Sequence, residues 1–204
     1  MVTGGASGIG EAIAKLFYEH GAKVVVADVQ DELGNSVCKD LGGSSNSIFI
    51  HCDVTNEDHV QEAVDRTITT FGKLDIMICN AGISDETKPR IIDNTKADFE
   101  RVLRFNVTGV FLSMKHAARV MVPMHSGCII STSSVIGLEN EELDKAMSAT
   151  GNLKGATLRV DDVAKAAQFL ASDDAQYISG HNLFIDGGFT VCNPGLGMFK
   201  HPEC

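Results

Sequence analysis

A glycine-rich stretch near the start of the chain has the residue types and spacing of a phosphate-binding turn. Residues 3–10 read Thr-Gly-Gly-Ala-Ser-Gly-Ile-Gly, between an apolar strand end and an amphipathic helical pattern. Glycine lets the backbone turn tightly and approach a pyrophosphate, whose charge then meets the N–H groups at the helix start. A glycine string by itself also fits a simple turn or a linker. The residues expected at the phosphates are Gly4, Ser7, Gly8, Ile9 and Gly10.

An acidic residue further along supports the phosphate-binding interpretation. Asp28 ends the next apolar run, eighteen residues after Gly10, where a carboxylate can accept hydrogen bonds from an adenosine ribose. The alternative is a helix N-cap for the segment that begins at Gln30. Residues 29–38 contain no Lys or Arg that could bind a 2′-phosphate, and Asp28 would repel one. The sequence therefore predicts NAD rather than NADP as cofactor.

The chain alternates apolar runs with longer amphipathic stretches, and we expect these elements to position the glycine turn and Asp28. Such alternation, up to about residue 132, is typical of a parallel α/β sheet. The expected strands are residues 1–3, 23–28, 47–52, 74–79 and 128–131, with a short further strand at 182–185. The expected helices are residues 9–20, 31–41, 57–71, 96–122 and 160–171. This order predicts one α/β domain over residues 1–204, a doubly wound parallel sheet of the Rossmann type.

Composition and charge disfavour several classes of function. Seventeen Lys and Arg against twenty-seven Asp and Glu give a net charge of −10 without a basic run, so nucleic acid and anionic membranes are poor partners. No apolar run approaches the roughly 20 residues of a bilayer span. No secretory signal precedes the glycine turn, so we expect a cytoplasmic protein. The six Cys and seven His lack metal-ligand spacing, so we expect reduced thiols and no metal site.

The helical stretch at residues 96–122 is apolar nearly all the way round. A helix of that kind must be covered on two sides, and one face of a sheet can cover only one of them. We expect a partner subunit on the other side. The sequence thus predicts a homo-oligomer that associates through this helix.

These features resemble the short-chain dehydrogenase/reductase family, and the likeness extends over nearly the whole chain. Residues 3–10 are similar to the family's TGxxxGIG, and residues 80–82 are similar to its NAG motif after the fourth strand. Residues 178–188 resemble its last strand with the flanks. The stretches at 111–121, 152–155 and 160–163 resemble a plant branch, which oxidises secondary alcohols of specialised metabolites with NAD.

The resemblance also implies roles for single residues. Ser134 falls at the family's catalytic serine, where its hydroxyl would bond the substrate oxygen; alternatively it is a polar strand end. Asn106 falls at the active-site asparagine, where it would hold an ordered water; alternatively it makes a hydrogen bond within a kinked helix. The implied substrate is a small-molecule secondary alcohol of terpenoid or phenolic type. Further cofactor contacts are implied for Asp53 and Val54, at the adenine ring, and for Asn80, Ala81 and Gly82.

The chain departs from the family at the residues that transfer a proton. The family uses Y-x-x-x-K, whose Tyr and Lys share one helix face, so that the ammonium lowers the pKa of the phenol. The two tyrosines of this chain, Tyr18 and Tyr177, have no Lys four residues on. Lys145-Ala-Met stands where the Tyr is expected. The simplest account is an internal deletion just after Leu138, which removes that helix and the following strand.

Such a deletion, together with a shortened first strand, predicts an incomplete sheet in which residues 139–159 are a remnant of the substrate lid. Two hypotheses for the function follow. The chain is either an NAD-dependent oxidoreductase of secondary alcohols or ketones that is impaired as written, or a non-catalytic isoform that binds dinucleotide or associates with other subunits. A different Rossmann enzyme, such as a methyltransferase, is disfavoured by Asp53, by residues 80–82 and by the Asp-Gly-Gly at 186–188.

Overall fold

A computed structural model describes residues 1–85, 88, 90–133, 152–153 and 155–190. Its sheet has five parallel strands in the order β3-β2-β1-β4-β5. The strands are β1 (Val2–Thr3), β2 (Val24–Asp28), β3 (Ser47–His51), β4 (Ile76–Cys79) and β5 (Cys128–Ser131). The helices are α1 (Gly8–Glu19), α2 (Asp31–Asp40), α3 (Glu57–Phe71), α4 (Lys96–Leu103), the π-helical η3 (Arg104–Gly109), α5 (Val110–Met121) and α7 (Val160–Leu170). Three short 3₁₀ turns are η1 (Gly43–Ser45), η2 (Ile91–Asp93) and η4 (Asp173–Ala175).

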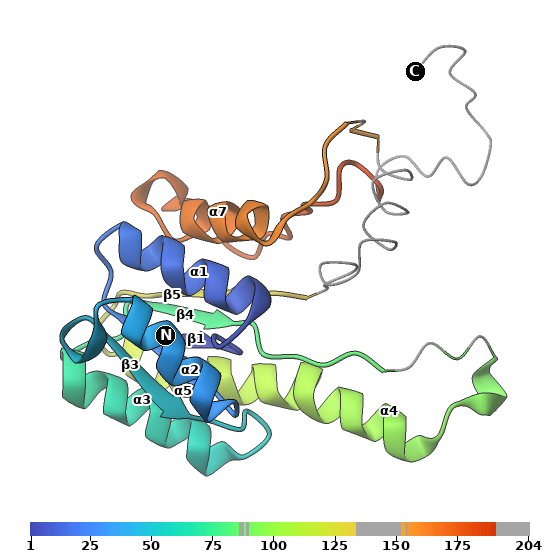
Figure 1. The fold of residues 1–204 in the computed structure, drawn as a ribbon, viewed down its shortest axis with the longest axis horizontal. Coiled ribbons are helices and arrows are strands. Elements are labelled where there is room, and N and C mark those ends of the chain that lie inside the picture. Colours follow the sequence, from blue (N-terminus) through green and yellow to red (C-terminus); the bar gives the residue numbers. More distant parts are fainter. Residues whose placement is uncertain (86–87, 89, 134–151, 154, 191–204) are drawn as a thin grey trace.

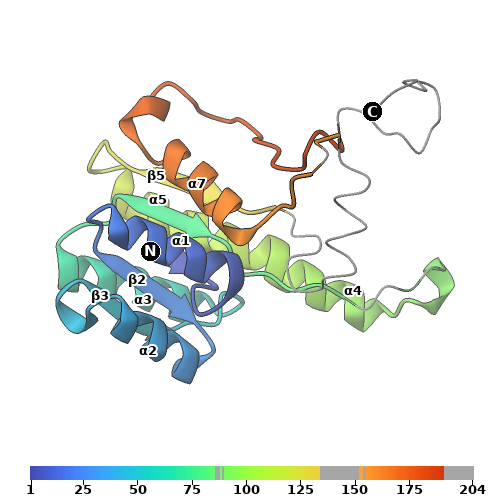
Figure 2. The same ribbon diagram turned by 45° about the horizontal axis from the view of Figure 1, so that its top comes forward.

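The central strands β1, β2 and β4 are largely buried, because helices cover both faces of the sheet, and this explains why they are continuous apolar runs. On one face, Val24 and Val26 of β2 pack with α1, α2 and α7. On the other face, Val25 and Ala27 of the same strand belong to the core formed with α3 and α5. Figures 1 and 2 show these helices in two layers with the sheet between them. The doubly wound α/β fold predicted from the sequence is confirmed.

The central strand of the sheet is β1, although it comes first in the chain. Val2 pairs with Val26 of β2 on one side and with Ile78 of β4 on the other. The chain therefore builds the sheet outward through β2 and β3, then returns to continue with β4 and β5 on the opposite side of β1. In open α/β sheets, ligands bind at the carboxyl ends of the strands where the order reverses in this way.

The single helix expected at residues 96–122 consists of α4, η3 and α5 in succession. The α5 segment packs on α3 and β4 and buries Leu112 and Ala117. The α4 segment has no buried residue, and it projects from the rest of the molecule (Figures 1 and 2). The described residues therefore do not cover α4 on two sides. The apolar side chains exposed along this stretch, called here the α4–α5 stripe, are Phe99, Leu103, Val107, Phe111 and Met114.

The prediction of a strand at residues 182–185 is wrong. Residues 182–184 are exposed, Ile185 is half-buried, and none of the four lies in a regular element. An extended segment forms a strand only where a neighbouring strand supplies hydrogen-bond partners, and none of the described strands pairs with it. Among the described helices, none combines the length and apolarity that crossing a bilayer requires.

Candidate functional site

The glycine turn at residues 3–10 leads from β1 into α1 at the point where the strand order reverses. A Cβ on Gly10 would lie 2.0 Å from the Gly4 carbonyl oxygen, so no larger residue fits there. Gly8 has φ +55°, and a Cβ on it would meet no atom within 4 Å, so its outer side is open. Gly8 also begins α1, whose first N–H groups have no partner within the helix. A tight backbone cradle with an open side at a helix start fits the pyrophosphate of a dinucleotide.

Two other residues predicted at the phosphates, Ser7 and Ile9, differ in what they can contribute. Ser7 is exposed, and its side chain makes no capping hydrogen bond to α1, so its hydroxyl is available to a ligand at the turn. Ile9 is buried, and its side chain belongs to the core between α1 and the sheet. Only the backbone of Ile9 can therefore contact a cofactor.

The hydroxyl of Thr3 joins the glycine turn to the end of β4. Its Oγ1 accepts hydrogen bonds from the backbone N–H groups of Asn80 (3.0 Å) and Ala81 (3.2 Å). It donates to the carbonyl oxygen of Ile78 at 3.2 Å. In return, Asn80 Nδ2 donates to the carbonyl oxygens of Thr3 (3.2 Å) and Gly4 (3.3 Å). The structure thus brings the two predicted loops, residues 3–10 and 80–82, together at the carboxyl edge of the sheet.

Neither Thr3 nor Thr132 has a role assigned from the sequence, yet the side chains of both stabilise this site. Thr132 follows β5, and its Oγ1 donates to Asn80 Oδ1 at 3.2 Å, so Asn80 is bonded to both of its neighbours in the sheet. A signal was present, because each Thr stands at or just after the end of an apolar strand. Side chains at such positions meet at one edge of a parallel sheet.

Asp28 supports the glycine turn from the side of β2. Its Oδ2 accepts a hydrogen bond from the Ala6 N–H at 3.0 Å. Its Oδ1 accepts from the backbone N–H of Gln30 (3.1 Å) and from the Gln30 side-chain Nε2 (3.2 Å). The alternative role as the N-cap of α2 is wrong, because the capping position is Gln30. The carboxylate lies at the carboxyl end of β2, beside the turn that would hold the pyrophosphate.

The residues implied at the adenine ring, Asp53 and Val54, follow β3. Asp53 Oδ1 accepts hydrogen bonds from Thr55 N (2.9 Å) and Thr55 Oγ1 (2.8 Å), which stabilises this loop. The Val54 side chain is buried against Gly109, where a Cβ would lie 2.7 Å from Val54 Cγ2. A ring stacked here would therefore meet the backbone of Val54 and the exposed part of Asp53, rather than the valine side chain.

Two cysteines lie at the ends of β3 and β4, close to the turn. Burial raises the pKa of the Cys52 thiol to about 12, and the nearby carboxylates of Asp53 and Asp28 act in the same direction. Burial likewise raises the pKa of Cys79 to about 12. Both thiols are protonated near neutral pH, so neither is a nucleophile. In the part of the chain that the structure describes, no three His, Cys, Asp or Glu side chains lie close enough together to hold a metal.

Asn106 lies in η3, and its amide group binds the backbone of the loop that follows β4. Its Oδ1 accepts from Ile83 N at 2.9 Å, and its Nδ2 donates to Ile83 O at 2.8 Å. A Cβ on Gly82 would lie 3.1 Å from the same Oδ1. The expected bond within a kinked helix is therefore a bond between helix and loop. The Asn106 side chain positions residues 82–83 at the site.

The predicted catalytic serine, Ser134, lies outside the described residues, as do Leu138 at the proposed deletion and Lys145. The described part of the chain leads as far as residue 133, two residues beyond the last strand residue, Ser131. Most of the predicted lid remnant at residues 139–159 also lies outside. The structure thus assembles the predicted cofactor side of the site.

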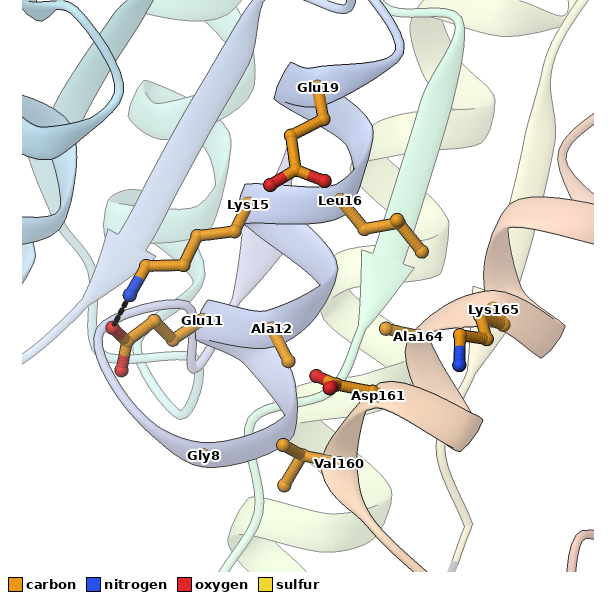
Figure 3. A pocket seen from close by; sticks show the side chains of 10 residues that line it. All are labelled: Gly8, Glu11, Ala12, Lys15, Leu16, Glu19, Val160, Asp161, Ala164 and Lys165. Carbon is orange, nitrogen blue, oxygen red and sulfur yellow. Dashed lines mark hydrogen bonds and ion pairs between the residues drawn. The ribbon is translucent and has the colours of Figure 1, made fainter.

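A groove of about 560 Å³ lies between α1 and α7 (Figure 3). It shares one residue, Gly8, with the predicted cofactor site and follows α1 to Glu19. Its charged lining has both signs, with Lys15 Nζ only 2.6 Å from Glu11 Oε1. Asp161 and Lys165 line it from α7, as Figure 3 shows. This groove is the seam between two packed helices rather than part of the crevice at the strand ends.

Comparison with protein families gives a match to the model described as short chain dehydrogenase over residues 1–157. A second model, described as enoyl-(acyl carrier protein) reductase, matches residues 137–190. Among solved structures, a short-chain type dehydrogenase/reductase from Mycobacterium marinum is similar with a TM-score of 0.78 and 28% identity. That similarity covers 93% of this chain and 94% of the other.

Curated relatives include several plant enzymes. Secoisolariciresinol dehydrogenase of Forsythia intermedia is 52% identical over an alignment that covers 100% of this chain and 92% of the relative. A mitochondrial borneol dehydrogenase of Lavandula x intermedia is 45% identical, with coverage of 98% and 93%. Momilactone A synthase of Oryza sativa subsp. japonica is 42% identical, with coverage of 98% and 92%.

Proposed function

The chain belongs to the short-chain dehydrogenase/reductase family, in its plant branch, and on that premise we propose that it is an NAD-dependent oxidoreductase of secondary alcohols or ketones. We propose further that the 204-residue chain is impaired in the proton-transfer step. The observation that carries this second part is the pair of tyrosines, Tyr18 and Tyr177, neither of which is followed by Lys at the fourth position.

The arrangement around the glycine turn supports a dinucleotide cofactor. Gly8 and Gly10 form the cradle for the pyrophosphate, and Asp28 lies at the adjoining strand end to receive the adenosine ribose. The lack of any Lys or Arg in residues 29–38 favours NAD, because the carboxylate of Asp28 would meet a 2′-phosphate without a compensating cation. Bound NAD would supply the hydride acceptor, and the protein would have to supply the base.

The names of the relatives support the substrate class. Enzymes named for secoisolariciresinol, a phenolic alcohol, and for borneol, a terpenoid alcohol, are 52% and 45% identical to this chain. Borneol is a secondary alcohol, and on that relative we propose a small-molecule secondary alcohol, or the matching ketone, of terpenoid or phenolic type. Residues 82–83, which Asn106 holds in place, follow β4 next to the proposed cofactor site, and we propose that they face such a substrate.

The length of the alignment supports an internal deletion. The alignment with secoisolariciresinol dehydrogenase extends over 257 positions against the 204 residues of this chain, a difference of 53. A gap of that size is sufficient for one helix, one strand and their connections. Without a positioned general base, alcohol oxidation loses about 10²- to 10⁴-fold in rate. Ser134 cannot replace that base, because its hydroxyl needs an adjacent base of its own.

The experiment compares the 204-residue chain with a version that carries the Tyr-and-Lys helix and following strand of secoisolariciresinol dehydrogenase, grafted after Leu138. NADH absorbance is followed with a panel of secondary alcohols. We expect turnover from the graft and none above background from the unmodified chain. Turnover by the unmodified chain comparable to that of the graft would contradict the proposed impairment.

The α4–α5 stripe favours a second candidate function, an isoform that binds other subunits. Phe99, on the projecting helix α4, is 62% exposed, and Phe111, on the packed helix α5, is 60% exposed. Contiguous apolar surface of this kind is normally covered by a partner. We therefore propose that the chain forms a homo-oligomer through this stripe, which sedimentation of the protein at micromolar concentration would test. The cytoplasmic location stays a prediction.

A further inference from the structure

We propose that the side chain of Gln30 is a gate on the carboxylate of Asp28, which has to open before the adenosine ribose can bind with both of its hydroxyls. The proposal rests on the proposed NAD site and names a residue that sets the affinity of that site. Its basis is the set of hydrogen-bond donors around Asp28, which is buried to all but 6% of its surface.

Three donors occupy the Asp28 carboxylate. The Ala6 N–H donates to Oδ2 at 3.0 Å, and the Gln30 N–H donates to Oδ1 at 3.1 Å. The third donor is the Gln30 side chain, whose Nε2 lies 3.2 Å from the same Oδ1. An ionised carboxylate has about four acceptor positions, so about one is left. A ribose that donates from both its 2′- and 3′-hydroxyl groups needs two.

Only one of the three donors is free to leave. The N–H groups of Ala6 and Gln30 belong to the glycine turn and to the residue that precedes α2, and both segments are part of the folded backbone. The Gln30 side chain is on an exposed residue and makes no capping hydrogen bond to α2. Rotation of this side chain is therefore the way to release a second acceptor position, and it breaks one hydrogen bond.

The chemistry of an amide makes Gln30 suitable as a gate for a ribose. The NH₂ group offers the carboxylate a neutral donor, which a ribose hydroxyl can replace with a bond of the same kind. It carries no positive charge that could hold a 2′-phosphate beside Asp28. Because the hydrogen bond from the Gln30 side chain to Asp28 must break before the ribose binds, the gate lowers the affinity of the site for the adenosine ribose by the free energy of that bond.

The experiment measures binding of ADP-ribose, and of ADP-ribose that lacks the 2′-hydroxyl of its adenosine, by calorimetry. The variants are Gln30→Met, which keeps the length of the side chain without a donor, and Gln30→Ala. We expect both to bind ADP-ribose about two- to tenfold more tightly than the unmodified chain, since a single hydrogen bond no longer competes. With the 2′-deoxy ligand, which needs one acceptor position, the gain should disappear.

The matched control is Asn35→Ala, which removes an exposed amide on α2 whose Nδ2 donates to Asp31 O at 2.7 Å within the same helix. Its affinity for both ligands should equal that of the unmodified chain. Unchanged or weaker binding of ADP-ribose by both Gln30 variants would overturn the gate alone, as would an equal gain with the 2′-deoxy ligand. Absence of binding by every chain would overturn the proposed cofactor together with the gate.

Discussion

Helices α3 and α4 begin in the same way but differ in what covers them. The side chain of Asn56 accepts a hydrogen bond from Asp58 N at the start of α3, and the side chain of Thr95 accepts one from Asp98 N at the start of α4. Yet α3 buries four residues, Val60, Ala63, Val64 and Thr67, whereas α4 buries none. Caps and periodicity therefore decide where a helix begins, and a neighbour in space decides whether its apolar face is covered.

The same contrast separates the cofactor side of the molecule from the rest. Each of the predicted strands β1 to β4 has a neighbouring strand, and the ends of β1 and β4 are joined by hydrogen bonds between Thr3 and Asn80. The α4–α5 stripe and the pair Leu183 and Phe184 have the apolar side chains of packed elements, but those side chains are exposed. We therefore expect a substitution on the packed side, at β1, β4 and the glycine turn, to affect folding and cofactor binding. A substitution on the exposed side, in the α4–α5 stripe, should affect association.

The largest effect is expected from Gly10→Ala. The added Cβ would lie 2.0 Å from Gly4 O and 2.8 Å from Asn80 Nδ2, so the turn would have to move away from β4. We expect NADH affinity, measured by fluorescence titration, to fall by more than about 100-fold, because the cradle loses its shape. The control Ala12→Gly on the same helix should cost only about 1 kcal/mol of stability and leave the affinity unchanged. Unchanged NADH affinity of Gly10→Ala would contradict the tight packing that we describe around the glycine turn.

A smaller effect is expected from Thr3→Val, which has nearly the same shape without the hydroxyl. The backbone N–H groups of Asn80 and Ala81 would lose their acceptor in a partly buried place. We expect a loss of about 2–4 kcal/mol in the free energy of unfolding, measured with urea. Thr69→Val is the control, because that exposed hydroxyl bonds only within its own helix, to Asp65 O. A loss no larger than that of the control would contradict the role given to Thr3.

A paired substitution tests α3 against α4 directly. Val64 is fully buried, and Val64→Ala should lower the free energy of unfolding by about 2 kcal/mol through the cavity it leaves. Phe99 is 62% exposed, and Phe99→Ala should change the stability of the monomer by less than about 0.5 kcal/mol. The same Phe99→Ala variant should weaken self-association in sedimentation experiments. Equal effects of Val64→Ala and Phe99→Ala on the free energy of unfolding would contradict the difference in burial between α3 and α4.

The smallest effect concerns pH and the contact of α3 with α5. Lys115 Nζ and His116 Nε2 lie 2.6 Å and 3.0 Å from Glu57 Oε1, and these hydrogen bonds lower the pKa of the Glu57 carboxyl. A lowered carboxyl pKa adds stability above the unfolded-state value of about 4.3, and this stability is lost as the pH falls through the folded-state value. In urea unfolding at several pH values, Glu57→Gln should be less stable than the unmodified chain at pH 6–7. The two should converge below pH 4, and a constant difference would contradict the assignment.

Most of the fold could be predicted because the strands of the sheet are short, apolar and separated by amphipathic helices. The strand at 128–131 and the helix at 57–71 have the predicted boundaries, since clear turn and cap residues flank them. The prediction of a strand at 182–185 failed because a short apolar run is only a local signal, whereas a strand also needs a pairing partner elsewhere in the sheet. The π-helical η3 also escaped prediction, because its residues have ordinary helical patterning.

At the site, the backbone elements were predictable and the side-chain contacts were not. The positions of Gly8, Gly10 and Asp28 follow from the order of strand, turn and helix. The bonds from Thr3 to Asn80 and from Gln30 to Asp28 depend on which side chains face each other across the sheet edge, which no spacing in the chain reveals. His116 also shows this limit: it is buried beside Glu57, which nothing in its spacing along the chain indicates.

The central place of β1 in the sheet has a consequence for how the molecule folds during synthesis. The hydroxyl of Thr3 bonds to Ile78, 75 positions later in the chain. A ribosome adds roughly 5–20 residues per second, so the first strand waits for seconds before its second neighbour exists. Contacts at such separation carry a large loop-closure cost and form slowly. The glycine turn that follows β1 can thus acquire its final shape only after β4 has been made.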